Sequence, residues 1–495
     1  AKIKWEMWGD CINISVHPTS PVHAVPSVTG FGLWYNVSGF QCNGIMTTIL
    51  NASLIRLMTA LIPVKRVRVR VRRRLLDRAR DARTARLVPI VRARYAAHAR
   101  RCRDTLARGE RLRVAFLVCD ASMFSAEPVF QAMMDDARFE PFIAVVPRVT
   151  RGEAFLRETL AKTQTTLLAR YPEKVESLYD PETRTARSLE GRADLVFTSI
   201  IYDDQTLEQY NVDAVSSYAL VAGMLYGYGG MTNSSLARVR DSPMVSAFWR
   251  FFAPNEAVAA SFRACNPYLS EATVVSGYPK MDRLASIVPR PRRPKTILVC
   301  PHHTLARGPG VMLALSNFLR FADFFLRLPK MFPDVKFVFR PHPLLFPRLS
   351  TREWWGTAQT ARYRAEMEAM PNVEFQQGGD YFETFANSDA LIHDCGSFLA
   401  EYFYTGRRQC YMAESEAALR RQYNDFGNRV LDHVSLASSE DEIVAFVRDV
   451  VASDGPLVLD AAAADFARRE ICLNHPHAAA RVVAEVMAAI ERNGG

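Results

Sequence analysis

The sequence has 495 residues, of which 49% are hydrophobic and 23% charged. This length allows two domains with appendages, and the composition predicts that most of the chain folds as a globular protein. Nine cysteines are scattered along the sequence without a CxxC pair. That pattern argues against a zinc ribbon or a small disulfide-stapled fold, and it suits a reducing compartment. No basic stretch leads into an apolar run with a small-residue cleavage site, so no signal peptide is expected.

The net charge of +10 comes from one stretch of the chain. Residues 61–113 contain 19 Lys and Arg against 4 Asp and Glu, whereas the rest of the sequence holds 43 basic and 48 acidic residues. The basic character is therefore a local patch and not a property of the whole protein.

The N-terminal extension, 1–110, contains three different stretches. Residues 1–43 show no convincing period and are expected to be poorly ordered. Residues 44–64 are apolar but are interrupted by Asn51 and Arg56, which makes them a marginal membrane span and favours a helix lying in the plane of the interface.

The arginine-rich run 65–87 follows directly and suits an anionic membrane surface. A solvated basic linker or helix face is the alternative. Nucleic-acid binding is disfavoured because the run has no aromatic residues on which bases could stack.

Short apolar runs separated by helix-like segments recur in two series. The first series, in an expected domain 111–290, has strand-like runs at 114–120, 139–147, 193–201 and 213–220. The second, in an expected domain 291–495, has them at 296–301, 336–343, 372–375, 389–394 and 408–412, followed by helices from 413 onward. The Pro-rich stretch 288–295 is the expected hinge. This pattern predicts two Rossmann-like α/β domains whose strand carboxyl ends face a common cleft.

Two motifs lie at or just after the expected hinge. In GYPKMDRL, Gly277 opens a turn, Lys280 offers a cation and Asp282 could cap the segment after it, although ordinary turn chemistry would also explain the motif. In PHHT, His302 and His303 can donate hydrogen bonds to phosphate oxygens or move a proton. Neighbouring side chains in an extended segment point apart, so this pair is a poor metal site, and a structural histidine pair is the alternative.

Two further motifs end strands of the second series. In FVFRPHP, Arg340 and His342 are two residues apart and can point to the same side, and the planar fork of Arg suits a diphosphate. In the stretch 388–412, the strand ends at Asp394, and Gly396 and Ser397 lead into a helix. The free N–H groups of a helix N-terminus and the Ser397 hydroxyl could hold a phosphate.

Glu401 lies one turn further along that expected helix. Its carboxylate could hold ribose hydroxyls, or it could merely cap the helix or pair with an arginine. The whole stretch could also be an ordinary strand–turn–helix.

In their order and spacing these four motifs resemble the CDP-glycerol glycerophosphotransferase family, which builds teichoic-acid-like or capsular polymers of the cell envelope. The resemblance covers roughly 113–412 and is most specific after 277. It implies a GT-B fold, a donor bound mainly by the C-terminal domain, no metal, and no cofactor besides the donor substrate CDP-glycerol. By this resemblance, contacts to the donor diphosphate or glycerol phosphate come from Arg340, His342, Asp394 and Ser397.

The sequence departs from the family in one place. Many members carry a His-Gly-Thr motif in the N-terminal domain, and its histidine is taken as the base. The comparable stretch here is MLYGYGG, 224–230, and no histidine occurs between His98 and His302. Glu127 is the leading substitute, with Asp204 behind it, although either could be a surface carboxylate. Tyr226 and Gly227 are expected to shape the acceptor side.

The sequence thus predicts transfer of glycerol phosphate from CDP-glycerol to a hydroxyl of a lipid-linked or polysaccharide acceptor, with release of CMP. His302, His303 and His342 would act by positioning and charge stabilisation. The enzyme would be peripheral, at the cytoplasmic face of the cell membrane, with no nucleic-acid partner. Two alternatives remain: a GT-B glycosyltransferase that uses a nucleotide sugar in capsule or lipopolysaccharide synthesis, and a non-catalytic membrane scaffold.

Overall fold

The computed structural model describes 62 and 65–492, except 203, 233–242, 266, 291–293 and 307–313, together with short stretches at 2–8, 11–17, 34–35, 55 and 59–60. The chain divides into two compact units, 1–83 and 84–495.

The first unit contains a small antiparallel sheet. It has the strand order β1-β2-β3, with β1 (Lys2–Trp8), β2 (Cys11–His17) and β3 (Trp34–Tyr35). Residues 1–43 were predicted to be poorly ordered, and within that range the structure describes only these strands. The sequences KIKWEMW and CINISVH alternate apolar and polar residues, a period of two that is typical of strands.

Most of the apolar stretch 44–64 lies outside the described residues, so the expected interfacial helix is not tested there. Within the part of the chain that the structure describes, no helix combines the length and the apolar character that crossing a membrane requires.

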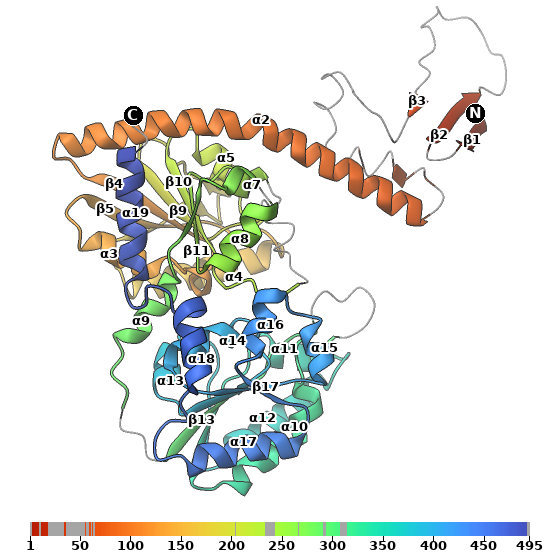
Figure 1. Ribbon diagram of the computed structural model, residues 1–495, viewed down its shortest axis with the longest axis vertical. Coiled ribbons are helices and arrows are strands. Elements are labelled where there is room, and N and C mark those ends of the chain that lie inside the picture. Colours follow the sequence, from red (N-terminus) through yellow and green to blue (C-terminus); the bar gives the residue numbers. More distant parts are fainter. Residues whose placement is uncertain are drawn as a thin grey trace, which may run out of the picture. The chain divides into compact units, whose positions relative to one another are not determined.

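The arginine-rich run is the first part of one long helix, α2 (Lys65–Ala107) (Figure 1). None of the described side chains from 67 to 83 is buried. The second part places a buried stripe at intervals of three and four residues against the sheet that comes next in the chain, with Thr84, Val88, Val91, Tyr95, His98 and Cys102. The Tyr95 hydroxyl donates to the Ala247 carbonyl at 2.7 Å, so this half of α2 belongs to the same folded lobe as that sheet.

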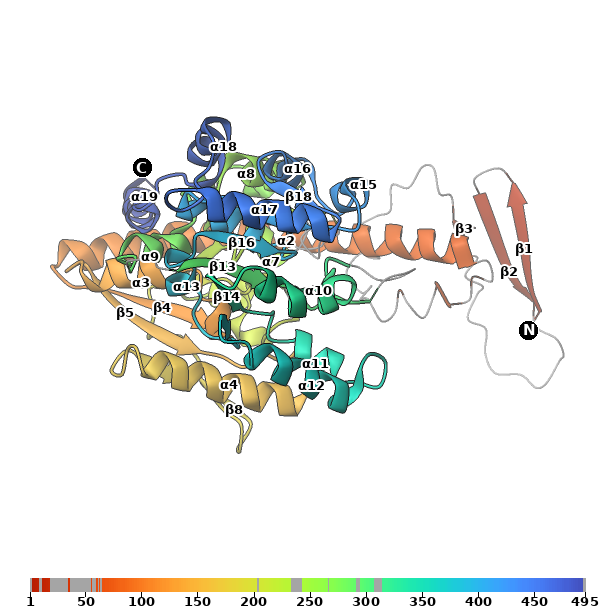
Figure 2. The ribbon, with the colours of Figure 1, turned by 90° about the horizontal axis from the view of Figure 1, so that it is seen from below.

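The N-lobe is built on a seven-stranded parallel sheet with the order β12-β11-β10-β9-β4-β5-β6. Its strands are β4 (Leu112–Val118), β5 (Phe139–Val145), β6 (Val175–Ser177), β9 (Leu195–Thr198), β10 (Leu220–Met224), β11 (Arg250–Ala253) and β12 (Thr273–Val275). Its helices are α3 (Glu127–Met134), α4 (Glu153–Leu168), α5 (Val212–Val215), α7 (Pro243–Ser246) and α8 (Glu256–Cys265). A hairpin of β7 (Tyr179–Asp180) and β8 (Thr185–Ala186) projects beyond α4 (Figure 2).

The strand predicted at 213–220 was wrong. Residues 212–215 form the short helix α5, and the strand is β10, which begins only at Leu220. A short apolar run does not distinguish a strand from a buried helical turn.

The C-lobe is built on a six-stranded parallel sheet with the order β15-β14-β13-β16-β17-β18. Its strands are β13 (Lys295–Cys300), β14 (Val335–Phe339), β15 (Val373–Phe375), β16 (Ala390–His393), β17 (Gln409–Met412) and β18 (Ser435–Ala437). The chain order reverses between β13 and β16, and open α/β sheets bind their ligands at the carboxyl ends of strands around such a reversal.

Helices cover both faces of the C-lobe sheet. Ile297 and Val299 of β13 face a core shared with α10 (Phe318–Met331), α11 (Leu345–Leu349), α12 (Gly356–Glu368) and α17 (Glu440–Ala452). Leu298 and Cys300 face the other core, with α13 (Phe382–Ala386), α14 (Phe398–Glu401), α15 (Glu416–Arg420), α16 (Asp425–Leu431) and α18 (Ala461–Phe466). This second core continues into the N-lobe.

The chain crosses between the lobes twice. The first crossing carries the short helix α9 (Asp282–Ala285), and the expected hinge 288–295 comes after it, of which 291–293 are not described. The second leads from α18 to the last helix, α19 (Ala478–Arg492), which lies beside α3 in the N-lobe (Figure 1). Arg103 of α2 donates to the Ile490 carbonyl of α19 at 2.7 Å. The helices expected from 413 onward are present, and the last of them returns to the N-lobe.

Candidate functional site

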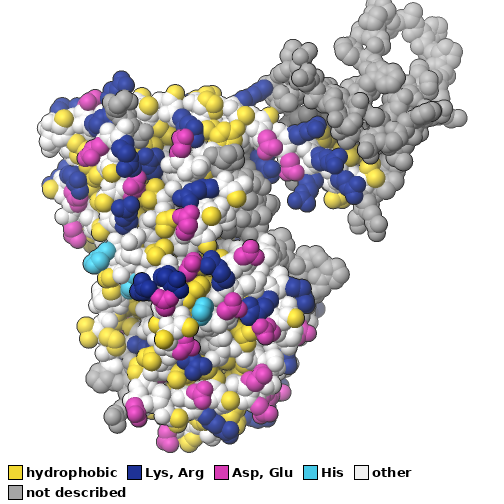
Figure 3. Space-filling model, viewed as in Figure 1, with side chains coloured by type: hydrophobic (Ala, Val, Ile, Leu, Met, Phe, Trp, Pro, Cys, Tyr) yellow, Lys and Arg dark blue, Asp and Glu magenta, His cyan; other side chains and the backbone are white. Residues whose placement is uncertain are grey.

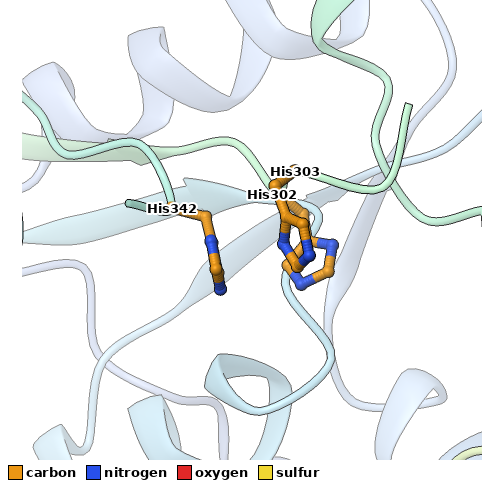
Figure 4. Close-up of side chains that lie close together, drawn as sticks. All are labelled: His302, His303 and His342. Atoms are coloured by element: carbon orange, nitrogen blue, oxygen red, sulfur yellow. The ribbon is translucent and has the colours of Figure 1, made fainter. Parts of the chain in front are cut away.

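Three histidines meet at the carboxyl ends of two neighbouring strands of the C-lobe. His302 and His303 follow β13, and His342 follows β14 (Figure 4). The ring centroids of His303 and His342 are 3.9 Å apart, those of His302 and His303 4.3 Å, and those of His302 and His342 5.0 Å. These three residues are called the histidine cluster below.

The expectation that His302 and His303 point apart was wrong. It assumed an extended backbone, but the chain bends at His303, where the Leu305 amide donates to the His303 carbonyl at 3.0 Å. The bend brings both rings to the same side.

Asp394 holds the loop that carries His302. Its side chain is fully buried, one carboxylate oxygen accepts from the His302 amide at 2.5 Å, and the other accepts from the Asn317 amide at 2.6 Å. The sequence predicted that Asp394 contacts the donor. In the structure its carboxylate accepts hydrogen bonds from two backbone amides instead, so Asp394 positions the cluster by holding the loop that carries His302.

The histidine cluster is uncharged at neutral pH. Burial, together with the positive charges nearby, lowers the pKa of His303 to about 3 and that of His342 to about 4, and it lowers the pKa of His302 well below its ordinary value. Arg348 contributes to all three shifts, and Arg151 of the N-lobe contributes to that of His303.

Sequence reasoning missed both arginines. Arg348 lies in α11, six residues after His342, and its guanidinium donates to the His303 carbonyl at 3.3 Å. The signal that could have found it is a basic residue one turn into the helix that follows the RPHP loop. Arg151 lies in the loop after β5, and nothing in its local sequence marks it.

The ring nitrogens of the cluster lie within 4.8 Å of one another, a spacing that would admit a metal ion. Two observations favour an anion. The Leu344 amide donates to Nδ1 of His342 at 3.1 Å, so the proton of the neutral ring is on Nε2, which then cannot coordinate a metal. The charged groups that act on the three rings are arginines, not carboxylates.

Arg340, which was predicted to bind the donor diphosphate, makes its hydrogen bonds to the loop after β15. Its guanidinium donates to the Gln376 side chain at 2.9 Å and to the Gly379 carbonyl at 2.7 Å. It therefore holds the loop after β15, whereas His342, two residues later, joins the cluster.

Arg340 and that loop border an open cavity of about 530 Å³. Its wall combines polar and apolar groups and is lined by Arg283, Ile287, Arg340, Gln376, Gln377, Gly378, Asp380, Phe382, Glu383 and Thr384. Arg340 lines this cavity and His342 belongs to the histidine cluster, and two backbone steps keep their Cα atoms within about 7 Å of each other.

Lys280 and Glu401 were predicted separately, and the structure joins them. Lys280 Nζ lies 3.2 Å from a carboxylate oxygen of Glu401, and the Tyr381 hydroxyl donates to the other oxygen at 2.6 Å. Glu401 is 1% exposed. The pair fastens the crossing segment to the C-lobe, so the predicted role of Glu401 in holding ribose hydroxyls is not supported. The predicted alternative was a cap or a pair with an arginine, and the observed cationic partner is Lys280.

Gly277 and Asp282 support the second crossing of the chain. Gly277 has a φ of +85°, and a Cβ there would lie 2.1 Å from the Leu473 carbonyl oxygen, so only glycine fits. Asp282 accepts from the Ala479 amide at 2.7 Å and so caps α19. Both residues therefore contact the segment that leads into α19.

The helix after Asp394 is shorter than predicted. α14 has four residues and is followed by a 3₁₀ turn (Tyr402–Thr405), and Ser397 makes no side-chain cap. Ser397 is exposed, and a Cβ at Gly396 would lie 3.1 Å from the Met231 side chain. A single turn aligns few N–H groups, so this helix N-terminus offers a phosphate less than the predicted helix would, and the predicted phosphate contact of Ser397 stays a prediction.

Glu127, the leading substitute for the base, is buried and fully engaged. It is ion-paired with Arg170 and with Arg283, the latter at 3.2 Å, and it accepts from the Tyr171 hydroxyl at 2.8 Å. Both oxygens have partners, which is the arrangement of a structural carboxylate. Asp204 is exposed.

The two acceptor-side residues follow β10. Tyr226 is half-buried, its hydroxyl lies 3.5 Å from that of Tyr202, and burial raises its pKa. A Cβ on Gly227 would meet nothing within 4 Å, so this position borders open space.

Comparison with known proteins agrees with this architecture. No protein family and no curated protein matches the sequence. Among solved structures, a UDP-N-acetylglucosamine 2-epimerase matches with a TM-score of 0.50 and 12% identity, over 77% of this chain and 97% of that one. The fold is GT-B-like. The predicted α/β fold with parallel sheets is confirmed.

Two further matches have lower scores. The wall teichoic acid polymerase TagF, in a variant soaked with CDPG, matches at a TM-score of 0.49 and 13% identity, over 83% of this chain and 98% of that one. HepE from Anabaena, in complex with UDP-glucose, matches at 0.42 and 12% identity, over 77% of this chain and 100% of that one. TagF is thus among the structural neighbours, as the sequence motifs predicted.

Proposed function

We propose that the chain is a transferase that takes a nucleotide-diphosphate-linked donor and moves glycerol phosphate from CDP-glycerol to an acceptor hydroxyl, releasing CMP. One observation carries this proposal. Three uncharged imidazoles and an exposed arginine, Arg348, converge beside the point where the C-lobe strand order reverses. Donors of hydrogen bonds and positive charge, with no carboxylate among them, suit a diphosphate.

The cavity beside Arg340 is the proposed nucleoside site. Its volume of about 530 Å³ is in the range of small-molecule sites. The Thr384 hydroxyl oxygen, the side-chain amide of Gln377 and the backbone of Gly378 offer donors and acceptors to a pyrimidine edge or a ribose, whereas the Gln376 side chain is bonded to Arg340, Glu374 and Thr384. Because Arg340 of this cavity is two residues before His342, we expect one donor to place its nucleoside in the cavity and its diphosphate at the histidine cluster.

The proposed step is a displacement at the β-phosphorus of CDP-glycerol. The acceptor oxygen forms the new P–O bond, the bond to the bridging oxygen breaks, and its electron pair leaves with CMP. The acceptor hydroxyl loses its proton to a neutral imidazole. His303 is the candidate for this role because its Nδ1 has no hydrogen-bond partner among the described residues, and the negative charge of a bound donor would raise its pKa from about 3.

A glycosyl transfer from a nucleotide sugar is the second candidate. The match to the UDP-N-acetylglucosamine 2-epimerase supports it, because that protein is named for a nucleotide sugar and its fold is shared. The anion site and the cavity would serve either donor. The fate of the phosphate distinguishes them, since a UDP-sugar would leave UDP, whereas CDP-glycerol would leave CMP.

The proposal includes a peripheral location at the cytoplasmic face of the cell membrane, where a lipid-linked acceptor would be reached. The support is the first half of α2, which carries ten basic and two acidic residues between 65 and 83. Figure 3 shows Lys and Arg side chains gathered along this half of the helix. Each basic residue near an anionic surface contributes about 1 kcal/mol.

Vesicle co-sedimentation tests this location. The full chain should bind phosphatidylglycerol vesicles and not phosphatidylcholine vesicles, and replacing Arg70, Arg73 and Arg74 by Gln should weaken binding. A chain with Arg327, Arg352 and Arg468 replaced by Gln, all exposed on the C-lobe, is the matched control. Equal loss in both variants would mean that only net charge matters.

Product analysis tests the reaction. The protein is incubated with membranes and one donor at a time: CDP-glycerol, UDP-glucose or UDP-N-acetylglucosamine. His342→Ala is assayed in the same way. The control is His433→Ala, because the His433 ring stacks on Phe466 in another part of the C-lobe. CMP formed only from CDP-glycerol, and only by the wild type and the control, supports the proposal. UDP release supports glycosyl transfer, epimerised sugar without nucleotide release supports an epimerase, and turnover unchanged in His342→Ala overturns the site.

A further inference from the structure

We propose that Arg348 is the residue whose charge binds the donor diphosphate, and that Arg340 instead positions the wall of the nucleoside cavity. This inference rests on the proposed function, because it assumes that the histidine cluster receives a nucleotide diphosphate. It assigns to Arg348 the role that the RPHP motif suggests for Arg340.

The backbone places Arg348 over the histidine cluster. The turn after His342 is closed by the Leu345 amide, which donates to the His342 carbonyl at 2.8 Å, and α11 begins there. One turn later, the Arg348 guanidinium reaches back to the loop after β13 and donates to the His303 carbonyl at 3.3 Å. Arg348 therefore bridges the two loops that supply the histidines.

The guanidinium of Arg348 is available, whereas that of Arg340 is committed. Arg348 is exposed, and no ion pair joins it to a carboxylate among the described residues. An arginine has five N–H donors, and the bond to His303 uses one of them. Arg340 is 8% exposed, and both terminal nitrogens of its guanidinium are bonded to the loop after β15.

The surroundings of Arg348 offer it no counter-charge among the described residues. It lies beside three imidazoles whose pKa values it lowers, which means that it disfavours any further positive charge there. Arg151 acts on His303 in the same sense. A diphosphate would supply the negative charge and accept hydrogen bonds from the guanidinium and from Nε2 of His342.

Isothermal titration calorimetry with three probes tests this assignment: inorganic pyrophosphate, CDP and cytidine. Arg348→Ala should weaken pyrophosphate and CDP by about tenfold to a hundredfold, as expected for charged hydrogen bonds, and leave cytidine unchanged. Arg340→Ala should weaken cytidine as well as CDP. Arg348→Lys should restore part of the pyrophosphate affinity.

Arg352→Ala is the matched control, because Arg352 is an exposed arginine four residues further along the chain. It should bind all three probes as the wild type does, and thermal unfolding confirms that each variant is folded. If Arg348→Ala binds pyrophosphate as the wild type does, the inference is wrong while the proposed function stands. If the wild type binds neither pyrophosphate nor CDP, the proposed function itself is wrong.

Discussion

Replacing Asp394 by Asn should weaken both the fold and the donor site, although the residue touches no ligand. Asp394 is fully buried, and its two oxygens accept from the His302 and Asn317 amides at 2.5 and 2.6 Å. An asparagine keeps one acceptor oxygen and turns its NH₂ group toward the other amide. One charged hydrogen bond is lost and one buried N–H is left unpaired, which together cost about 2–4 kcal/mol.

The expected loss in function follows from which loop is released. Without the bond to its amide, His302 is no longer fixed at the end of β13, and the neighbouring His303 moves with it. Pyrophosphate affinity should fall several-fold in protein that is still folded. Urea unfolding measures the loss of stability, and calorimetry below the unfolding transition measures the affinity.

Asp389→Asn is the matched control for this prediction. Asp389 is 2% exposed and accepts from the Thr296 amide at 2.7 Å, at the amino end of the same strand β13. It should cost similar stability and leave pyrophosphate affinity unchanged, because ligands bind at the other end of the sheet. If both variants bind pyrophosphate equally well, Asp394 does not position the cluster and the reasoning is refuted.

Three further predictions concern a glycine, a carboxylate and the pH. Gly277→Ala should destabilise the fold by about 3 kcal/mol or more, because its Cβ would lie 2.1 Å from the Leu473 carbonyl oxygen at a φ of +85°; an unchanged melting temperature would contradict the crossing geometry. Glu127→Gln should cost about 1–3 kcal/mol in thermal or urea unfolding, because it removes ion pairs to partly exposed arginines, and it should keep most of the turnover; a hundredfold loss of turnover in folded protein would restore Glu127 as the base. The pKa of His303 is about 3 and that of His342 about 4 before an anion binds, and a bound anion raises both pKa values. The cluster therefore takes up protons on binding, and pyrophosphate affinity should increase as the pH falls from 8 to 5. Titrations in buffers of different ionisation enthalpy measure this proton uptake, and finding none would contradict the prediction.

The proximity of the three histidines could have been predicted from the sequence. Buried parallel strands appear as continuous apolar runs, so the ends of β13 and β14 could be located, and their carboxyl ends lie on one edge of the sheet. What the sequence could not supply was the side-chain direction after each strand ends. The assumption of an extended chain failed at His303, where the backbone bends. It also predicted that Arg340 lies beside the histidines, whereas Arg340 is bonded to the loop after β15 and Arg348 is bonded to His303.

The misplaced candidates share a cause, which is contact between residues distant in the sequence. Asp282 was expected to act locally, but its partner is the amide of Ala479, 197 residues further along. Glu401 is neutralised by Lys280, 121 residues before it. Local sequence propensity carries no information about such long-range pairs. In each pair, a side chain that could have bound a ligand instead stabilises the fold.

The segment that departs from the family pattern is also part of the framework, and this determines where the base must be sought. The Gly230 carbonyl accepts from the Asn424 amide at 2.9 Å, and the Tyr228 hydroxyl donates to the Ile471 carbonyl at 2.9 Å, so YGYGG is fastened to the C-lobe. Its tyrosines cannot serve as bases at neutral pH, because burial raises the pKa of both Tyr226 and Tyr228. A proton acceptor at neutral pH must be uncharged or anionic and must have a free lone pair. Glu127 is held by two arginines and the Tyr171 hydroxyl. Nδ1 of His303 has no hydrogen-bond partner among the described residues, and the negative charge of a bound donor would raise its pKa from about 3, so in the proposed reaction the donor-binding lobe supplies the base as well.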